Sequence, residues 1–255
     1  MRIYVIKASN FFSAAILASM LILIITAGFI SSGSSHVSGA SRDLPIYSVN
    51  CPEKKVAITF DCAWGASDIP KILDTLEKED VKATFFIVGQ WAEKYPDAVR
   101  MMAEKGHDVA NHSYSHLRMG ALDKERLKSE ITKCGDVLNR ITRKKIELMR
   151  PPYGDYSNNT ISVARSLGYY TIQWDVDSLD WKPGISPQEI ANRVMRKARA
   201  GSIILFHNDT PHTANILPNI ITALKKQGYS FEPVSKLIMR ENYFLDFEGR
   251  QQRKP

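Results

Sequence analysis

The 255-residue chain lacks several features that would assign it at once to a known class of protein. It has only three cysteines, Cys51, Cys62 and Cys134, and no CxxC pair, which excludes a disulfide framework. Neither a GxGxxG nor a GxxxxGK[ST] motif follows the first expected strand, which argues against a nucleotide-binding doubly wound fold. With 14 glycines and 12 prolines, the chain is not collagen-like or proline-rich.

The sequence also lacks a concentrated run of basic residues. Its 34 Lys and Arg against 27 Asp and Glu give a formal net charge of +7, but the two signs are interspersed. A nucleic-acid-binding protein would gather its basic residues in a stripe, so we expect no nucleic-acid partner. Nothing in the sequence predicts a protein partner. The mild positive surplus suits an environment rich in anionic polymer or lipid.

One long hydrophobic run lies near the amino terminus. Residues 11–30 carry no charge, and residues 1–10 carry two positive charges and no negative one. About 20 apolar residues are needed to cross a bilayer as a helix, and preceding basic residues keep the amino terminus in the cytoplasm. We therefore expect a cytoplasmic basic stub over 1–10 and a transmembrane anchor or signal peptide over 11–30. The remainder would be extracytoplasmic, membrane-anchored or secreted if cleaved, with a flexible Ser/Gly-rich stem over 31–50.

Beyond the stem, expected strands and helices alternate. Strands are expected at 55–60, 83–88, 108–110, 146–149, 169–174, 202–206 and 231–234, and helices at 67–79, 96–105, 123–141, 159–167, 187–199 and 214–227. Repeated β-then-α units imply a parallel sheet. We predict a single α/β domain over 51–240, a distorted (β/α) barrel of about seven parallel strands. A basic tail over 241–255 is expected to be disordered, and either solvated or in contact with anionic polymer or lipid.

Polar residues collect directly after these expected strands. They are Asp61 and Cys62, His112 and His116, Arg150 and Tyr153, Asp180 and Trp181, and His207. In a barrel, the loops after the strands build the active site. The sequence therefore predicts one functional site at the carboxyl ends of the strands.

The first candidate pair is His112 and His116. On a helical turn, residues four apart share one face, and two imidazoles placed in this way suit a single Zn²⁺. The alternative is a polar loop in which the histidines cap or bridge backbone groups. The metalloprotease form HExxH is absent, because Ser113 stands where its glutamate would be. A carboxylate from another strand end favours the metal, since zinc hydrolases typically use three protein ligands and water.

A second pair is expected between Asp61 and Arg150. Asp61 follows an apolar run directly, and a buried carboxylate is unfavourable unless it is paired. Either the pair is a purely structural ion pair, or Arg150 keeps Asp61 ionised so that the carboxylate acts as a general base.

His207 also follows an apolar strand and needs a partner that fixes its tautomer. Asp180 could accept from one ring nitrogen, leaving the other for general acid catalysis. Trp181 and Leu205 could form a small apolar wall beside it. The alternatives are a histidine that caps backbone groups and a tryptophan that belongs to the core.

Five ordered motifs resemble the polysaccharide deacetylase family of the NodB-homology type, carbohydrate esterase family 4. They are TFDC at 59–62, HSYSH at 112–116, RPPYG at 150–154, DSLDW at 177–181 and LFH at 205–207. The resemblance spans about 54–240, and the DCAWG variant at 61–65 looks similar to the sporulation-associated, PdaB-like branch. It implies metal-dependent removal of N-acetyl groups from amino sugars of cell-wall polysaccharide, with peptidoglycan favoured over chitin.

The resemblance also implies a role for each site residue. Asp61 would be the base that acts on a metal-activated water, with Arg150 orienting it. His112 and His116 would hold a divalent metal, Zn²⁺ first and Co²⁺, Ni²⁺ or Mn²⁺ as alternatives. His207 would be the general acid, tuned by Asp180. The backbone N–H of Tyr153 would bind the oxyanion, and Trp181 and Leu205 would line the pocket for the acetyl methyl group.

One position departs from the family pattern. The first motif usually reads T-F-D-D, its second aspartate being the third metal ligand, and here that residue is Cys62. Cys62 could ligate zinc as a thiolate. Alternatively, the two histidines hold the metal with Asp68 or water, or the metal site is weak or lost. The last case would leave a membrane-tethered glycan-binding relative with little or no activity.

Overall fold

The computed structural model describes residues 43–255. The predicted stub at 1–10, the hydrophobic segment at 11–30 and most of the predicted stem lie outside the described residues. Within 43–255, none of the helices combines the length and the apolar character that crossing a bilayer requires.

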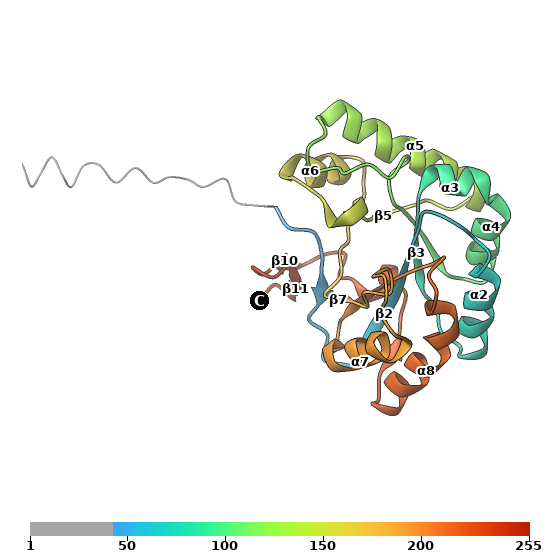
Figure 1. Cartoon of the computed structure of the whole chain (residues 1–255). Coiled ribbons are helices and arrows are strands. Elements are labelled where there is room, and N and C mark those ends of the chain that lie inside the picture. Colours follow the sequence, from blue (N-terminus) through green and yellow to red (C-terminus); the bar gives the residue numbers. More distant parts are fainter. Residues whose placement is uncertain (1–42) are drawn as a thin grey trace, which may run out of the picture. The chain divides into compact units, whose positions relative to one another are not determined.

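A curled parallel sheet forms the centre of the domain (Figure 1). Its strands are β2 (Lys55–Cys62), β3 (Thr84–Ile87), β4 (Asp108–Asn111), β5 (Leu148–Met149), β6 (Tyr170–Thr171), β7 (Val176–Asp177), β8 (Ile203–His207) and β9 (Ser230–Phe231). The order is β6-β5-β4-β3-β2-β8-β7, and β9 pairs with the start of β2. Because β6 and β7 lie at opposite edges, the sheet is a half-barrel. The predicted single α/β domain with a parallel sheet is confirmed, whereas the sheet that was predicted as a distorted barrel is an open half-barrel in the described residues.

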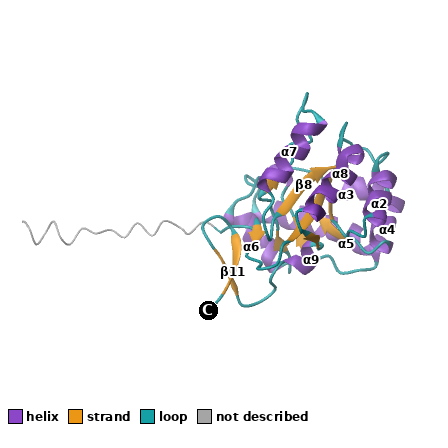
Figure 2. Cartoon of the chain, turned by 90° about the horizontal axis from the view of Figure 1, so that it is seen from below, coloured by secondary structure: helices purple, strands orange, loops and turns teal. Residues whose placement is uncertain are grey.

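Helices cover the outer face of the sheet, as the strands (orange) and helices (purple) of Figure 2 show. They are α2 (Ile69–Lys78), α3 (Gly89–Lys94), α4 (Pro96–Glu104), α5 (Lys124–Thr142), α6 (Asn158–Ser166), α7 (Pro187–Lys197), α8 (Thr213–Lys226) and the short α9 (Val234–Leu237). Local signals set several of their starts. Asp123 accepts a hydrogen bond from the Arg126 amide, and Ser157 and Ser186 form capping boxes.

The two faces of β2 have different surroundings, because successive side chains of a strand point to opposite faces. Phe60 and Cys62 belong to the large cluster between the sheet and the helices, together with Ile69 of α2. Ala57 belongs to the inner cluster of the half-barrel. Asp61 lies on this inner face, where it meets buried polar groups.

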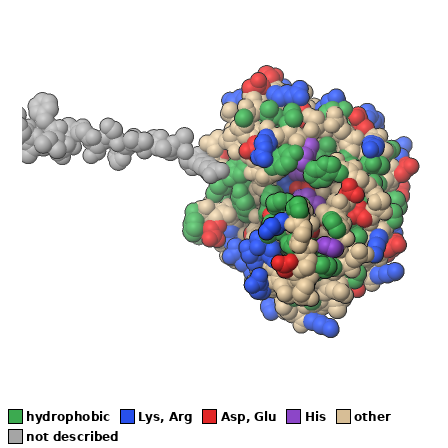
Figure 3. Space-filling model, viewed as in Figure 1, with side chains coloured by type: hydrophobic (Ala, Val, Ile, Leu, Met, Phe, Trp, Pro, Cys, Tyr) green, Lys and Arg blue, Asp and Glu red, His purple; other side chains and the backbone are tan. Residues whose placement is uncertain are grey.

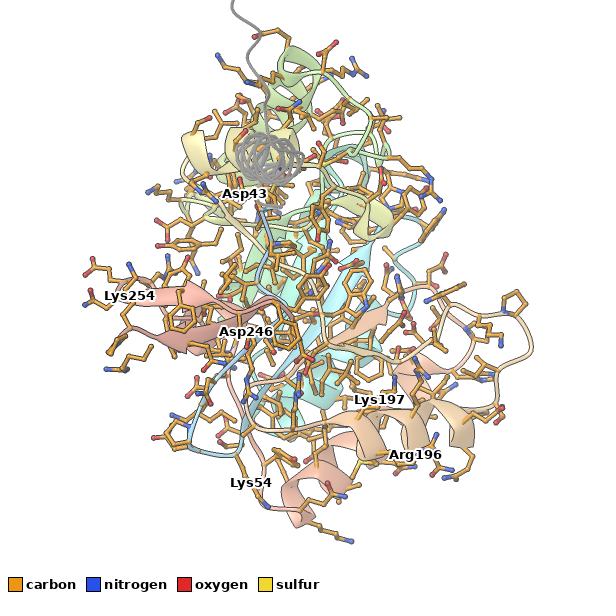
Figure 4. The ribbon with its side chains drawn as sticks, turned by 90° about the vertical axis from the view of Figure 1, so that its left-hand side faces the viewer. Asp43, Lys54, Arg196, Lys197, Asp246 and Lys254 are labelled. Carbon is orange, nitrogen blue, oxygen red and sulfur yellow. The ribbon has the colours of Figure 1, made fainter. Side chains whose placement is uncertain are left out.

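Both ends of the described chain form part of the domain. β1 (Ser48–Val49), β11 (Arg250–Arg253) and β10 (Tyr243–Leu245) form a second sheet in that order. Figure 4 shows β10 and β11 against the half-barrel, with Asp246 and Lys254 labelled. The predicted disordered tail is therefore wrong, and residues 46–49 are strand-paired, not part of a stem. The tail looks polar, but the Gln251 side chain is buried and bonds both backbone groups of Met239.

Candidate active site

A cleft of about 640 Å³ opens at the carboxyl ends of the central strands. Histidine side chains are visible near the middle of the face shown in Figure 3, with hydrophobic side chains beside them. Seven of the predicted site residues line the cleft, namely Asp61, His112, His116, Tyr153, Trp181, Leu205 and His207. Arg150 and Asp180 are fully buried and contact Asp61 and His207 respectively. Cys62 and Asp68 are not among the lining residues.

Arg150 binds Asp61 as the sequence predicts. Its Nη1 donates to Asp61 Oδ1 at 2.6 Å and to Thr59 Oγ1 at 3.0 Å, and its Nη2 donates to the Gln173 carbonyl at 3.0 Å. The guanidinium lies over the Phe86 ring, 3.9 Å from its centroid. Burial alone would raise the pKa of Asp61, but the charge of Arg150, helped by nearby histidines, outweighs burial and lowers that pKa. The carboxylate is therefore ionised and held in one orientation.

The two paired histidines do not lie on a helical turn, so that prediction is wrong. After β4 the chain forms a loop in which Ser113 and His116 adopt left-handed φ angles of 61° and 58°. The buried Glu130 of α5 holds this loop by accepting from the amides of Tyr114 and Ser115. The rings nevertheless lie together, with centroids 5.1 Å apart. Glu130 was missed because a charged residue on an amphipathic helix ordinarily faces solvent.

His112 and His116 have the protonation state of metal ligands. The His112 Nδ1 donates to the Arg150 carbonyl at 2.8 Å, which leaves Nε2 3.4 Å from Asp61 Oδ2. Burial lowers the pKa of His112, and burial with the charge of His112 lowers the pKa of His116 to about 4. A neutral imidazole whose second nitrogen bonds a carbonyl is the usual form of a ligating histidine. The donor set therefore fits a divalent metal through two imidazoles.

Neither candidate for the third ligand is placed to complete that set. Cys62 packs within the helix-side core, and burial followed by the charges of Asp61 and Asp68 raises the pKa of its thiol. Asp68 does not line the cleft, and its Oδ2 accepts from the amide of Asp209, a residue of the cleft wall, at 2.9 Å. Over residues 43–255, no group of three or more His, Cys, Asp or Glu side chains is arranged to hold a metal.

Asp180 binds His207, again as the sequence predicts. Its Oδ1 meets His207 Nδ1 at 2.8 Å, and its Oδ2 accepts from the His207 amide at 2.7 Å and from Thr213 Oγ1 at 2.6 Å. Burial opposes the imidazolium, but the hydrogen bond and charge of Asp180 prevail and raise the pKa of His207. His207 thus has the opposite protonation tendency to the two paired histidines.

Aromatic side chains form the rim of the cleft. Tyr153 is 54% exposed and has a left-handed φ of 60°, a strained conformation for a bulky residue. Trp181 is 54% exposed, while Leu205 is buried at the same cleft. Trp64, 58% exposed, also lines it and was not predicted. The sequence feature that could have identified Trp64 as a cleft residue is its position three residues after Asp61, just beyond the end of β2.

A parallel half-barrel whose cleft combines an ionised carboxylate, two neutral histidines and a carboxylate-bound histidine defines a hydrolase of the acid–base type. The family model of polysaccharide deacetylase matches residues 48–172. The chain belongs to this family, carbohydrate esterase family 4, whose enzymes are hydrolases acting on carbon–nitrogen bonds other than peptide bonds.

Three relatives illustrate the range of the family. A peptidoglycan-N-acetylglucosamine deacetylase of Bacillus cereus is 38% identical over 192 residues, covering 72% of this chain and 69% of that protein. The peptidoglycan-N-acetylmuramic acid deacetylase PdaA of Bacillus subtilis is 32% identical over 204 residues, covering 78% and 77%. The solved structure of a family 4 pseudoenzyme from Bacillus anthracis has a TM-score of 0.73 and 35% identity, covering 76% and 68%.

Proposed function

We propose that this chain removes acetyl groups from N-acetylated amino sugars of cell-wall polysaccharide, with peptidoglycan as the substrate polymer. It would act outside the cytoplasm, held at the membrane by the hydrophobic segment at 11–30 or secreted after its cleavage. The observation that carries the proposal is the presence of two separately tuned groups in one cleft. Arg150 lowers the pKa of Asp61 and so favours its ionised form, whereas Asp180 raises the pKa of His207 and so favours its protonated form. A protein that only binds glycan needs neither a base nor an acid.

The base side of the reaction rests on Asp61. A divalent metal at His112 and His116, Zn²⁺ first, would supply a Lewis acid that polarises the acetamide carbonyl and makes water more acidic. Asp61 accepts the proton of the water that attacks that carbonyl. The bond from Arg150 keeps the carboxylate in one orientation and disfavours its protonation.

The acid side rests on His207. The sugar nitrogen leaves poorly as an anion, so His207 donates a proton to it as the carbon–nitrogen bond breaks. The backbone N–H of Tyr153 would bind the developing oxyanion, a contribution worth roughly 3–4 kcal/mol for one donor in other hydrolases. Trp181 and Leu205 would receive the acetyl methyl group, because they present apolar surface in the same cleft.

Acetate release from peptidoglycan by the purified full chain tests the proposal. Replacing Asp61 with Asn removes the base but keeps a side chain of similar shape, so we expect the rate to fall by roughly 10²–10⁴-fold. The His207→Gln variant should lose activity on a similar scale. Equal acetate release by Asp61→Asn and the parent chain would refute the assignment of the base. A companion experiment measures bound zinc in His112→Ala and His116→Ala, where unchanged metal content in both variants would refute the metal assignment.

The second candidate is a membrane-tethered glycan-binding relative without turnover. The observation that favours it is the position of Cys62 and Asp68, neither of which completes the metal shell. The family contains such a case, since a relative of known structure is a pseudoenzyme. Glycan binding without acetate release, even after zinc is added, would support this candidate over the enzyme.

A further inference from the structure

An arginine on the wall of the cleft has no role in the reaction outlined above. Arg118 lies two residues beyond His116, is exposed and lines the cleft. Its guanidinium carbon is 4.7 Å from the centroid of the Tyr153 ring, and that ring is 4.6 Å from the imidazole of His116. The three side chains lie in a row, with the His116 and Tyr153 rings tilted by 57°, so the cation is one aromatic ring away from the paired histidines.

The guanidinium of Arg118 is available for a ligand. Among the residues that the structure describes, it forms no ion pair. Besides Asp61, two carboxylates line the cleft, and neither pairs with Arg118. Asp177 accepts from the Leu179 N–H, and Asp209 accepts from the Gly65 N–H. A guanidinium held against an aromatic ring keeps its planar edge of donors free for a carboxylate.

We propose that Arg118 binds the carboxylate of a lactyl substituent on the sugar whose acetamide reacts. The inference rests on the proposed function and deepens it, because it makes N-acetylmuramic acid units with a free lactyl carboxylate, not amide-linked to a peptide, the preferred substrate over N-acetylglucosamine. In N-acetylmuramic acid the lactyl ether and the acetamido group occupy neighbouring ring carbons. A sugar whose acetamide lies between the paired histidines and His207 therefore carries its carboxylate close to the reacting group. N-Acetylglucosamine has an uncharged hydroxyl at that position.

The arrangement of Arg118, Tyr153 and His116 favours this placement. The carboxylate must lie beside the reacting acetamide without entering the space occupied by Asp61, whose negative charge would repel it. Arg118 is separated from His116 by the Tyr153 ring, and within residues 43–255 each carboxylate that lines the cleft already accepts a hydrogen bond from another group. A charge-assisted pair there would be partly exposed, so its contribution should be moderate and reduced by salt.

Equilibrium binding tests the inference without any need for turnover. The full chain is titrated calorimetrically with three tetrasaccharides. One is an alternating N-acetylglucosamine–N-acetylmuramic acid oligomer with free lactyl carboxylates, the second is the same oligomer with those carboxylates amidated, and the third is chitotetraose. We expect the free acid to bind about tenfold more tightly than the other two, equivalent to about 1.4 kcal/mol. The preference should shrink as salt concentration rises.

Two variants complete the test. Arg118→Gln should abolish the preference while leaving the affinity for chitotetraose unchanged. Arg140→Gln, which changes an exposed arginine in the last turn of α5, is the matched control and should retain the preference. Equal affinity of the parent chain for all three glycans, no measurable binding of the free acid, or a preference that survives Arg118→Gln would overturn the inference.

The two proposals fail in different ways. Acetate release from both glycan types with equal binding refutes the role of Arg118 and leaves the deacetylase intact. A carboxylate preference that depends on Arg118, found in a chain that releases no acetate, refutes the proposed catalysis and leaves the recognition site intact.

Discussion

His107 is expected to make the fold sensitive to acid. Its side chain is 4% exposed at the start of β4, where Nδ1 accepts a hydrogen bond from the Ala83 amide at 3.2 Å. Its ring lies edge-on to Phe85, with centroids 5.4 Å apart. Burial, followed by the charges of Lys82 and Lys105, lowers its pKa from 6.5 to about 4. Protonation would convert Nδ1 from an acceptor into a donor and break the bond to Ala83.

The sign and size of the effect follow from linkage. The pKa of His107 is lower in the folded chain than in the unfolded chain, so the unfolded chain binds more protons between these values. The contribution of neutral His107 to the free energy of unfolding is fully present above about pH 6.5 and is lost as the pH falls towards about 4. Between about pH 8 and about pH 5, the shift corresponds to a loss of about 2 kcal/mol in the free energy of unfolding.

Replacing His107 with Gln removes the titration and keeps an amide oxygen that can accept from the Ala83 N–H. We expect urea unfolding of the variant to show about 2 kcal/mol less loss of stability between about pH 8 and about pH 5 than the parent chain shows. His116, whose pKa is also about 4, is present in both chains and cancels in the comparison. Parallel losses in the two chains would refute the reasoning, because they would show that His107 does not stay neutral in the folded state.

Three further predictions concern the site and its support. Asp180→Asn removes the charge that raises the pKa of His207, so the alkaline limb of the pH–rate profile should move to lower pH and the rate should fall roughly 10–100-fold; an unmoved limb would contradict the pairing. Cys62→Ala should lower the free energy of unfolding by roughly 1–2 kcal/mol through lost packing and leave bound zinc unchanged by metal analysis; loss of zinc would show that the thiol is a ligand. Gly201→Ala should destabilise the chain by more than about 2 kcal/mol in urea, because φ is 82° and the new Cβ would lie 1.7 Å from the Val49 carbonyl oxygen; a negligible effect would show that β1 does not pack there.

The central strands and their helices were predictable because their hydrophobic patterns are local. The run 55–60 belongs to β2, and the periodic segment 123–141 belongs to α5. The strands that were missed depend on distant partners. β7 has only two residues and exists because it pairs with β8, and β11 exists because it lies between β1 and β10. Such pairing leaves little trace in a short polar segment.

The same distinction applies to the site. The pairs Asp61–Arg150 and His207–Asp180 could be inferred, since a buried charge or imidazole after an apolar strand requires a partner. The loop around His116 could not, because its left-handed residues are held by Glu130 from another element. Family resemblance supplied roles for individual residues but carried no information about the surroundings of this chain's own Cys62.

The departure at Cys62 follows from the alternation of β2. Asp61 and Cys62 are adjacent, and they face opposite sides of the sheet. The thiol therefore occupies the same apolar cluster as Ile69 and Trp91, where an ionised aspartate would be buried without a cation beside it. An aspartate at this position could serve a metal only if the end of the strand turned towards the cleft, away from the helices. With cysteine at position 62, the strand end does not have to turn. Any metal in the cleft would then be bound by the imidazoles of His112 and His116 without a ligand from residue 62.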